Sequence, residues 1–323
     1  MQAIHIAFCV GGNYIPYVAV SIKSIVENHR NGTICIHILT NRLSKKLRGR
    51  LSDVVSAYSN VRLEIHLVDD YALTGLKTGA WTIYTWYRLL LPEILPDDVK
   101  KVLYLDADTL VMADLSELAA LDMTDRSIAA VLDPMSFTEK TFVRCGYDAE
   151  KLYVCAGVML MNLDYWRKHR LMEKIIEWSR MHADDLEYPD QDAINYACRD
   201  SKIVLPFRFG ILNYFQYERF YKPPYFEEIK ECIEKPVIVH YANCYPWLKD
   251  WNRHPFHLDW LKYNDMLRHP VRRTYRNKGW LAFKLWLWDT LHPRAVKALT
   301  KGEVVLKIRQ IEQSNGLSDA DVS

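Results

Sequence analysis

The sequence predicts an α/β protein whose sheet is mostly parallel and is covered by helices on both faces. Through the first two thirds of the chain, short apolar runs alternate with segments of helical spacing, and this alternation is typical of a parallel sheet with crossover helices. The composition is globular, with 50% apolar and 25% charged residues, which excludes disordered and low-complexity classes. With 323 residues, the chain can form one large domain, or one domain plus an appendage.

The elements follow from hydrophobic spacing. The first apolar run, Ile4–Val10, indicates a buried strand and not a signal peptide, because it lacks a basic start and a cleavage site. The other expected strands are Ile34–Leu39, Val61–Val68, Lys101–Leu105, Ile128–Leu132, Gly157–Leu163 and Pro236–His240. Helices are expected over Tyr14–His29, over Ser44–Tyr58, from about Asp164 to Met181, and from a start near Asp190. After Trp260 the pattern changes to basic and aromatic residues.

The cysteines and the apolar runs indicate in which cellular compartment the protein works. There are seven cysteines, an odd number without a C-x-x-C pair, which argues against a cysteine zinc cluster and a disulfide framework. No stretch reaches the roughly 18 uninterrupted apolar residues that a membrane span needs. We therefore expect a cytosolic protein with reduced thiols.

Residues that follow the predicted strands are the first candidates for a functional site, because open α/β sheets bind ligands beyond the carboxyl ends of their strands. They are Gly11-Gly12-Asn13, Asp69-Asp70, Asp106-Ala107-Asp108, Asp133 and His240-Tyr241. Two carboxylates two residues apart, Asp106 and Asp108, can reach one hard cation. His240 is a candidate third ligand, and its nitrogen suits Mn²⁺ better than Mg²⁺. The alternatives are a turn or helix cap for the aspartates and a core histidine for His240.

A second candidate is the segment Tyr188-Pro-Asp-Gln-Asp192, a loop followed by a helix start. In one interpretation Asp190 is an N-cap and the next two residues are polar members of the first turn. In the other, a carboxylate and an amide lie over a reacting sugar carbon, where charge of oxocarbenium type develops. Residue chemistry alone leaves both open.

Several enzyme classes lack support. The Gly-Gly-Asn turn lets backbone approach a nucleotide closely, but the chain has neither G-x-G-x-x-G nor G-x-x-x-x-G-K-[ST], which disfavours dinucleotide dehydrogenases and P-loop enzymes. No nucleophile motif such as G-x-S-x-G is present.

Taken together, six motifs resemble those of the family 8 retaining glycosyltransferases, the group that includes bacterial lipopolysaccharide galactosyl- and glucosyltransferases and glycogenin. Each motif is weak alone, but their order and spacing are specific, and the resemblance covers about residues 3–265. The motifs are Gly11-Gly-Asn-Tyr14, Trp86-Tyr-Arg-Leu89, Val102-Leu-Tyr-Leu-Asp-Ala-Asp108, Cys155-Ala-Gly-Val158 with Asn162-Leu163, Asp190-Gln-Asp192, and His240-Tyr241 followed by Pro246-Trp247.

The resemblance implies a GT-A fold, a UDP-sugar donor and a Mn²⁺ cofactor, with Mg²⁺ as the alternative. By position, Asp106, Asp108 and His240 match the metal ligands, and Asp190 and Gln191 match the catalytic loop. The implied nucleotide-sugar site comprises Gly11, Gly12, Asn13, Arg88, Asp106, Ala107, Asp133 and Asn243. The implied reaction is transfer with retention, in which the metal neutralises the departing UDP and the acceptor hydroxyl attacks from the same face.

Three positions depart from the family pattern. The acidic residues that usually precede Asn13 are Gly11 and Gly12, and the usual asparagine before Ala-Gly is Cys155. The segment that begins at His240 is one residue short and lacks the lysine that grips the diphosphate. Lys249 or a base of the tail is the candidate substitute.

The carboxyl-terminal segment is basic and aromatic. Between Arg268 and Arg309 there are eleven Lys and Arg but only two acids, whereas the rest of the chain holds 31 bases and 38 acids. Residues 280–291 are rich in Trp, Leu and Phe, too short to span a bilayer but suited to its interface, where each nearby base adds about 1 kcal/mol at an anionic surface. The alternative is a helix docked on the catalytic domain; nucleic acid is not expected as a partner.

We therefore predict a hexosyltransferase domain over residues 1–265 and a basic, aromatic, helical segment over residues 266–323 that attaches to the cytoplasmic face of a bacterial inner membrane. The expected donor is UDP-glucose or UDP-galactose. The expected acceptor is a saccharide of lipopolysaccharide or another envelope oligosaccharide, and the tail favours a lipid-linked one. One rival is a nucleotidyltransferase, although a Gly-rich basic loop for a triphosphate is missing. The other is a non-catalytic family member that acts as a membrane-bound partner, against which the retained Asp106, Asp108, Asp190 and Gln191 argue.

Overall fold

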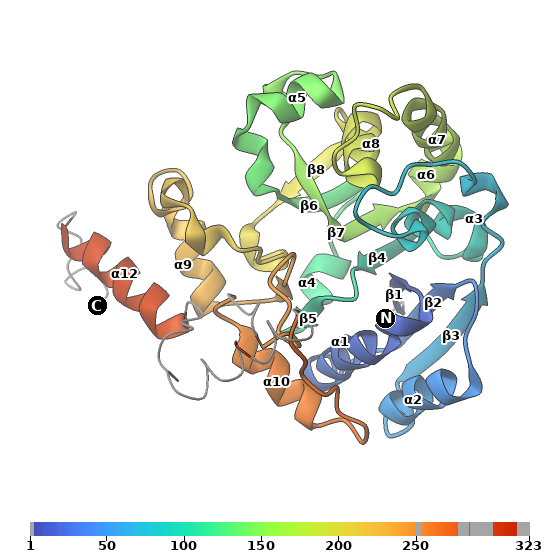
Figure 1. The fold of residues 1–323 in the computed structure, drawn as a ribbon, viewed down its shortest axis with the longest axis horizontal. Coiled ribbons are helices and arrows are strands. Elements are labelled where there is room, and N and C mark those ends of the chain that lie inside the picture. The colour runs from blue at the N-terminus through green and yellow to red at the C-terminus, as the bar shows by residue number, and fades with distance from the viewer. Residues whose placement is uncertain (1–2, 250–253, 277–283, 285–299, 315–323) are drawn as a thin grey trace.

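The structure, a computed structural model, describes residues 3–249, 254–276, 284 and 300–314. It confirms the predicted fold class: a seven-stranded mixed sheet with helices on both faces, in the strand order β3-β2-β1-β4-β7-β6-β8 (Figure 1). Only β7 runs antiparallel to its neighbours β4 and β6. The strands are β1 (Ile4–Cys9), β2 (Ile34–Thr40), β3 (Val61–Leu67), β4 (Lys101–Leu105), β6 (Ile128–Leu132), β7 (Val154–Asn162) and β8 (Lys202–Leu205).

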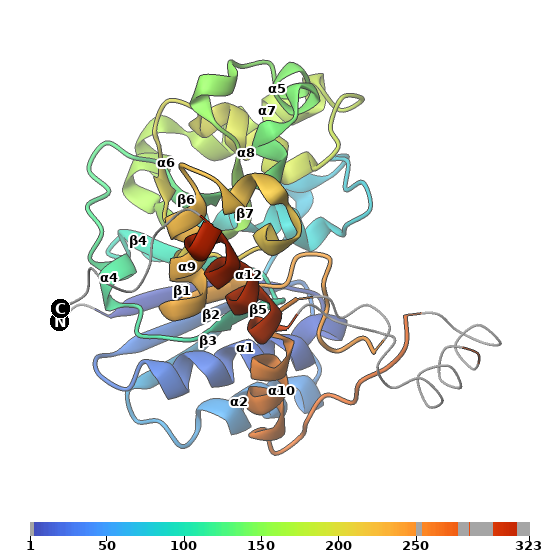
Figure 2. The ribbon, with the colours of Figure 1, turned by 90° about the vertical axis from the view of Figure 1, so that its left-hand side faces the viewer.

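Two helical layers bury the two faces of this sheet, as the two perpendicular views show (Figure 2). One face packs against α1 (Ile15–Asn28) and α2 (Lys45–Val55), whose first residue follows the predicted serine cap, Ser44. The other face packs against α3 (Leu91–Ile94), α6 (Leu163–His169), α7 (Leu171–Met181) and α8 (Pro189–Cys198). Alternate residues of each strand therefore enter different cores; Phe8 faces α1, and Ala7 faces the second layer.

Three expectations about elements need correction. The helix expected from Asp164 to Met181 is two helices, because Arg170 between them adopts a left-handed conformation, with φ 51°. The strand expected from Gly157 begins three residues earlier, at Val154. The strand expected over Pro236–His240 is β9 (Ile238–His240), which lies outside the main sheet and pairs antiparallel with the short β5 (Thr109–Val111).

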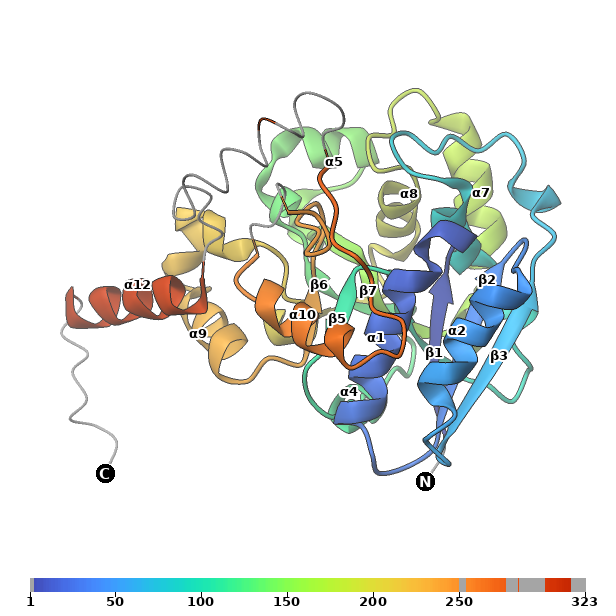
Figure 3. The ribbon, with the colours of Figure 1, turned by 60° about the horizontal axis from the view of Figure 1, so that its bottom comes forward.

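The remaining helices surround the sheet: α4 (Ser116–Ala119), α5 (Glu139–Cys145), α9 (Phe226–Glu234), α10 (His257–Asp265) and α12 (Lys301–Ser314). Figure 3 shows α10 beside α1, and α12 alongside α9. All seven cysteines lie within the described residues, are buried and form no disulfide. Among the helices of the described ranges, none combines the length and the apolar character that a membrane span requires.

Two described parts of the carboxyl-terminal segment, helix α12 and the stretch through Thr274, lie against the body of the protein. Helix α12 buries Val304 and Ile308. Its Glu312 forms an ion pair with Lys230 of α9, with 2.7 Å between Glu312 Oε1 and Lys230 Nζ. Upstream, the Lys249 amide donates to the Thr274 carbonyl at 2.8 Å. Residues 301–314 thus form a docked helix. The aromatic stretch 280–291 lies outside the described residues except for Lys284, and the domain boundary at residue 265 stays a prediction.

Candidate active site

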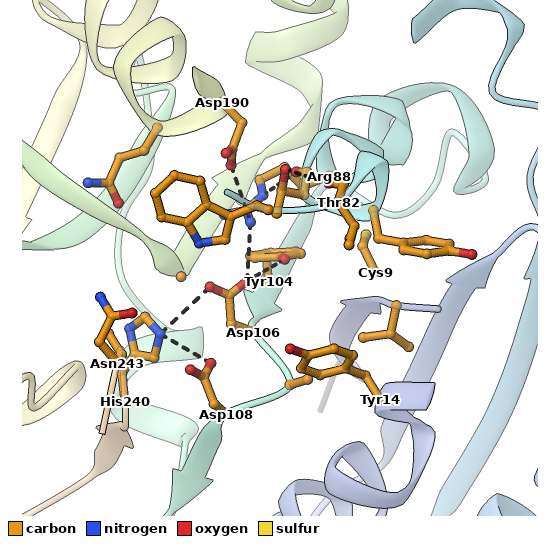
Figure 4. A pocket seen from close by; sticks show the side chains of 18 of the residues that line it. Cys9, Tyr14, Thr82, Arg88, Tyr104, Asp106, Asp108, Asp190, His240 and Asn243 are labelled. Atoms are coloured by element: carbon orange, nitrogen blue, oxygen red, sulfur yellow. Dashed lines mark hydrogen bonds and ion pairs between the residues drawn. The ribbon is translucent and has the colours of Figure 1, made fainter. Parts of the chain in front are cut away.

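A cleft of about 830 Å³ opens where β1, β4 and β6 end, next to the amino end of β7 (Figure 4). Its size is that of an ordinary small-molecule site. Every residue assigned to the metal, nucleotide-sugar and catalytic sites by the family resemblance lines it: Gly11, Gly12, Asn13, Arg88, Asp106, Ala107, Asp108, Asp133, Asp190, Gln191, His240 and Asn243. Of the residues that follow predicted strands, Asp69, Asp70 and Tyr241 do not line it.

Two carboxylates and an imidazole converge on one side of the cleft. His240 Nε2 lies 3.3 Å from Asp108 Oδ1 and 3.6 Å from Asp106 Oδ2. The short β5–β9 ladder causes this meeting, because its register places His240 opposite Thr109 and the Tyr241 amide donates to the Asp108 carbonyl at 2.9 Å. The three ligand atoms lie within 4.8 Å of one another. Hard oxygen donors with one imidazole fit a divalent cation such as Mn²⁺ or Mg²⁺.

The second oxygen of Asp106 is already held by the protein. Asp106 Oδ1 accepts hydrogen bonds from Tyr104 Oη at 2.5 Å and from Arg88 Nη2 at 3.1 Å. These bonds fix the carboxylate so that Oδ2 faces His240. Tyr104 lies on β4 and Asp106 follows the last residue of that strand, where its amide still pairs with the Gly157 carbonyl at 2.8 Å. The alternation of side chains therefore brings residues two positions apart to the same face. This spacing is the signal by which Tyr104 could have been found in the sequence.

Arg88 is buried, and each of its three guanidinium nitrogens has a partner within the chain. Nη1 donates to the Ala156 carbonyl at 2.6 Å, and Nε donates to the Thr85 carbonyl at 2.8 Å. Nη2 pairs with Asp106 and, at 3.3 Å, with Asp190 Oδ2. Arg88 therefore links the metal-ligand candidates to the loop at the start of α8.

Asp190 and Gln191 lie in the first turn of α8, which starts at Pro189 with Tyr188 as its N-cap. The interpretation of Asp190 as the N-cap is therefore wrong. Burial raises the pKa of Asp190 to about 6, although the Arg88 guanidinium opposes that rise. Gln191 is fixed at both ends of its amide: Oε1 accepts from the Ala156 amide at 2.9 Å, and Nε2 donates to Asp133 Oδ2 at 3.2 Å and to another neighbour, Tyr153 Oη, at 3.1 Å.

Asp133 ends β6 at the same edge of the sheet. Its Oδ1 accepts the Met135 amide at 2.8 Å, and its Oδ2 accepts from Gln191. Burial raises the pKa of this carboxyl, and the Met135 amide counteracts the rise. Asp133 thus positions the Gln191 amide and faces the cleft beside it.

Two glycines leave room that any side chain would fill. A Cβ on Gly157 would lie 2.5 Å from Asp106 Oδ2 and would overlap the His240 ring. A Cβ on Gly11 would overlap the Tyr84 ring. At these two positions the absence of a side chain keeps the floor of the cleft open.

The loop before α8 is anchored by a buried ion pair that the sequence did not reveal. Arg144 of α5 donates to Asp192 through Nε at 2.9 Å and Nη2 at 3.1 Å. The Asp192 carboxylate is fully buried and also accepts the amides of Glu187 and Tyr188 at 3.0 Å each, and Tyr153 Oη at 2.6 Å. Because α5 and α8 are far apart in the chain, no local motif marks this pair.

Replacing Arg144 by glutamine is expected to lower the free energy of unfolding by about 3 kcal/mol, because it leaves the buried Asp192 charge without its partner. Urea denaturation measures the change. The control is Arg170→Gln, which removes an exposed pair with Glu173 and should leave the unfolding midpoint unchanged. Equal midpoints for both variants would contradict the role of Arg144.

Cys155 lies in the cleft beside His240, whereas Lys249 lies outside it. Cys155 Sγ lies 3.5 Å from His240 Nδ1, so it orients the imidazole from the side away from the carboxylates. Lys249 Nζ lies 5.2 Å from the centroid of the Tyr275 ring, and Lys249 is not among the residues that line the cleft. Of the described Lys and Arg side chains, those that line it are Arg42 and Arg88.

Known proteins share this sequence pattern and this fold. The family described as "Glycosyl transferase family 8" matches residues 5–253. A lipopolysaccharide 1,2-glucosyltransferase of Escherichia coli is 30% identical over 264 residues, which cover 77% of this chain and 74% of that protein. A lipopolysaccharide 1,3-galactosyltransferase of Salmonella typhimurium is 24% identical over 266 residues, 78% of this chain and 74% of that protein.

The solved structure of the galactosyltransferase LgtC, in complex with donor and acceptor sugar analogues, aligns with a TM-score of 0.73. Its sequence is 25% identical, and the match covers 83% of this chain and 97% of that one.

Proposed function

The chain belongs to glycosyl transferase family 8, and on that premise we propose that it transfers glucose or galactose from a UDP-sugar, with retention of configuration, to a lipopolysaccharide or other envelope saccharide. The observation that carries the proposal is the convergence of Asp106, Asp108 and His240 with Asp190 and Gln191 in one cleft. Family membership makes the protein a glycosyltransferase, so the nucleotidyltransferase alternative is set aside.

We assign the cation site to Asp106, Asp108 and His240, with Mn²⁺ as the expected ion and Mg²⁺ as the alternative. When bound there, a divalent cation supplies positive charge against the departing diphosphate. The protein contributes orientation: Tyr104 and Arg88 hold one oxygen of Asp106 and leave the other toward His240.

The catalytic loop acts on the sugar. The Ala156 amide and Asp133 fix the Gln191 amide in a single orientation, and Arg88 fixes the Asp190 carboxylate. A carboxylate and an amide oxygen that are already oriented stabilise oxocarbenium charge at the sugar carbon without reorganising during the reaction. The acceptor hydroxyl attacks that carbon from the face that the diphosphate leaves.

Arg276 of the tail is our candidate for the cation that replaces the missing diphosphate lysine. Backbone bonds between Thr274 and both Trp247 and Lys249 hold this segment beside the cleft. Burial raises the pKa of Tyr245, which lines the cleft, and the positive charge of Arg276 opposes that rise. Lys249, by contrast, lies against Tyr275.

We place the reaction at the cytoplasmic face of a bacterial inner membrane, with a lipid-linked acceptor. Support comes from the 1,2-glucosyltransferase and 1,3-galactosyltransferase relatives, whose names specify lipopolysaccharide, and from the eleven bases between Arg268 and Arg309, which favour an anionic surface. Vesicle sedimentation with and without residues 315–323 and 277–299 would test the attachment.

The experiment that tests the proposed function measures UDP release from a panel of UDP-sugars, with Mn²⁺ or with a chelator. Slow hydrolysis needs no acceptor, so we expect release from UDP-glucose or UDP-galactose that chelation abolishes. With an acceptor, the anomeric proton coupling of the product reports retention. Absence of release from every donor, together with no binding of UDP and Mn²⁺ in calorimetry, would contradict the proposal and favour a non-catalytic family member.

A further inference from the structure

A second group of metal-ligating side chains lies away from the cleft, on strands β1, β2 and β3. Three histidines form a hydrogen-bonded row across these strands. His37 Nε2 lies 2.9 Å from His5 Nδ1, and His37 Nδ1 lies 3.0 Å from His66 Nε2. None of the three lines the cleft. β3 is an edge strand of the main sheet (Figure 1).

A carboxylate closes this row into a triangle of ligand atoms. Glu64 Oε2 lies 3.4 Å from His37 Nδ1 and 3.9 Å from His66 Nε2. With the 3.0 Å separation of the two nitrogens, the three sides bracket the roughly 3.3 Å between neighbouring ligands of a tetrahedral ion with metal–ligand distances of about 2.0–2.1 Å. Hydrogen bonds among the three histidines alone would not require the Glu64 carboxylate to lie this close to both His37 and His66.

From this triangle we propose that His37, Glu64 and His66 form a second metal site, for Zn²⁺ or a similar first-row transition metal, that joins the edge strand β3 to β2. Two imidazoles and one carboxylate are a known ligand set for such ions. The ion replaces the hydrogen bond between His37 Nδ1 and His66 Nε2, and the proton of that bond is then carried by the other nitrogen of His66. A water molecule takes the fourth position.

Two of the proposed ligands, His37 and Glu64, have a second hydrogen-bonding partner, as metal ligands usually do. With Nδ1 bound to the metal ion, the proton of neutral His37 is on Nε2, which lies 2.9 Å from His5 Nδ1 and can donate to it. Glu64 accepts the Cys35 thiol on its other oxygen, Oε1, at 3.3 Å. This arrangement favours the set of His37, Glu64 and His66 over the alternative of His5, Cys35 and His37, which also lies within 4.8 Å but contains no carboxylate.

Access and protonation agree with this assignment. The His37 side chain is 1% exposed, whereas those of His66 and Glu64 are 20% and 43% exposed, so an ion can enter from the solvent side. Burial lowers the pKa of His37 to about 4, although Glu64 opposes that shift, and burial also lowers the pKa of His66. Both shifts favour the neutral imidazole, the form that binds metal.

The experiment must first remove metal binding in the cleft, so the parent protein is the Asp106→Asn, Asp108→Asn double variant. Competition with a chromophoric chelator should show one bound Zn²⁺ per chain, and Zn²⁺ should raise the melting temperature. Co²⁺ in its place should give the visible absorption of a tetrahedral site. Adding Glu64→Gln or His66→Gln should weaken Zn²⁺ binding at least about 100-fold, and adding His5→Gln about 10–100-fold.

Glu139→Gln, on the exposed start of α5, is the matched control for loss of one negative charge and should bind like the parent. Cys35→Ser should keep the Co²⁺ spectrum, because Cys35 is not a ligand. Glutamine is isosteric with Glu64, whose side chain is half exposed, so folding is retained and circular dichroism verifies it. A parent that binds no Zn²⁺ overturns the proposal, as do Glu64→Gln and His66→Gln variants that bind as the parent does. The proposal is independent of the transferase reaction.

Discussion

Replacing Asp106 by asparagine is expected to lower metal-dependent UDP release about a thousandfold. The asparagine keeps the size of the side chain but removes the negative charge that faces His240 and, in our proposal, the cation. A loss of about 4 kcal/mol of transition-state stabilisation, within the range for a catalytic metal ion, corresponds to this factor. Initial rates of UDP release at saturating Mn²⁺, for the best donor of the panel, measure the change.

The matched control is Asp69→Asn, the same isosteric change after the end of β3. Asp69 is exposed, its Oδ1 accepts the Tyr71 amide at 3.1 Å, and the amide oxygen of asparagine can accept the same bond. We expect its rate to equal that of the wild type. An Asp106→Asn variant that retains more than about a tenth of the wild-type rate would show that the cation does not depend on this carboxylate.

Gly157→Ala is expected to abolish the same activity, although it replaces no charged residue. The added methyl would lie 2.5 Å from Asp106 Oδ2 and would overlap the His240 ring. Neither side chain can move freely, because Tyr104 and Arg88 hold Asp106 and His240 is buried. Displacing reactive groups by about 1 Å costs on the order of 100-fold in rate, so Mn²⁺ affinity and UDP release should fall together by at least this factor.

Gly49→Ala serves as the control for adding a methyl group. Gly49 lies in α2, and a Cβ there would meet no atom within 4 Å. Since alanine is the better helix former, this variant should gain about 0.5–1 kcal/mol in unfolding free energy and keep its activity. Calorimetric Mn²⁺ affinity of Gly157→Ala equal to that of Gly49→Ala would refute the crowding argument.

Much of this architecture could be predicted from sequence because the relevant signals are local. The strands that precede Asp106 and Asp133 are apolar runs that end in a carboxylate, and parallel strands bring such ends to one edge of the sheet. Asp106 and Asp133 accordingly line the same cleft. The family resemblance and the transferase class were confirmed by the comparisons, while the individual roles of the site residues stay predictions.

The elements that the sequence did not predict depend on contacts between distant segments. Strands β5 and β8 have three and four residues, too few for a hydrophobic period to be recognised. β9 joins β5 instead of the main sheet, and only this pairing explains how His240 meets Asp108. The Arg144–Asp192 pair joins helices that are 48 residues apart, and the row of His5, His37 and His66 appears only when three strands are aligned.

The backbone of Ala156 determines how this part of the cleft responds to genetic variation. The Ala156 amide donates to Gln191 at 2.9 Å and its carbonyl accepts from Arg88 at 2.6 Å. These two groups belong to consecutive planar peptide units that meet at the Ala156 Cα, so a single residue of β7 joins Gln191 to Arg88. Neither contact involves the side chain of Ala156. Amino-acid substitutions at this position therefore test only the space around the methyl group. The backbone contacts themselves can be changed only by altering the backbone, for example by replacing the amide with an ester.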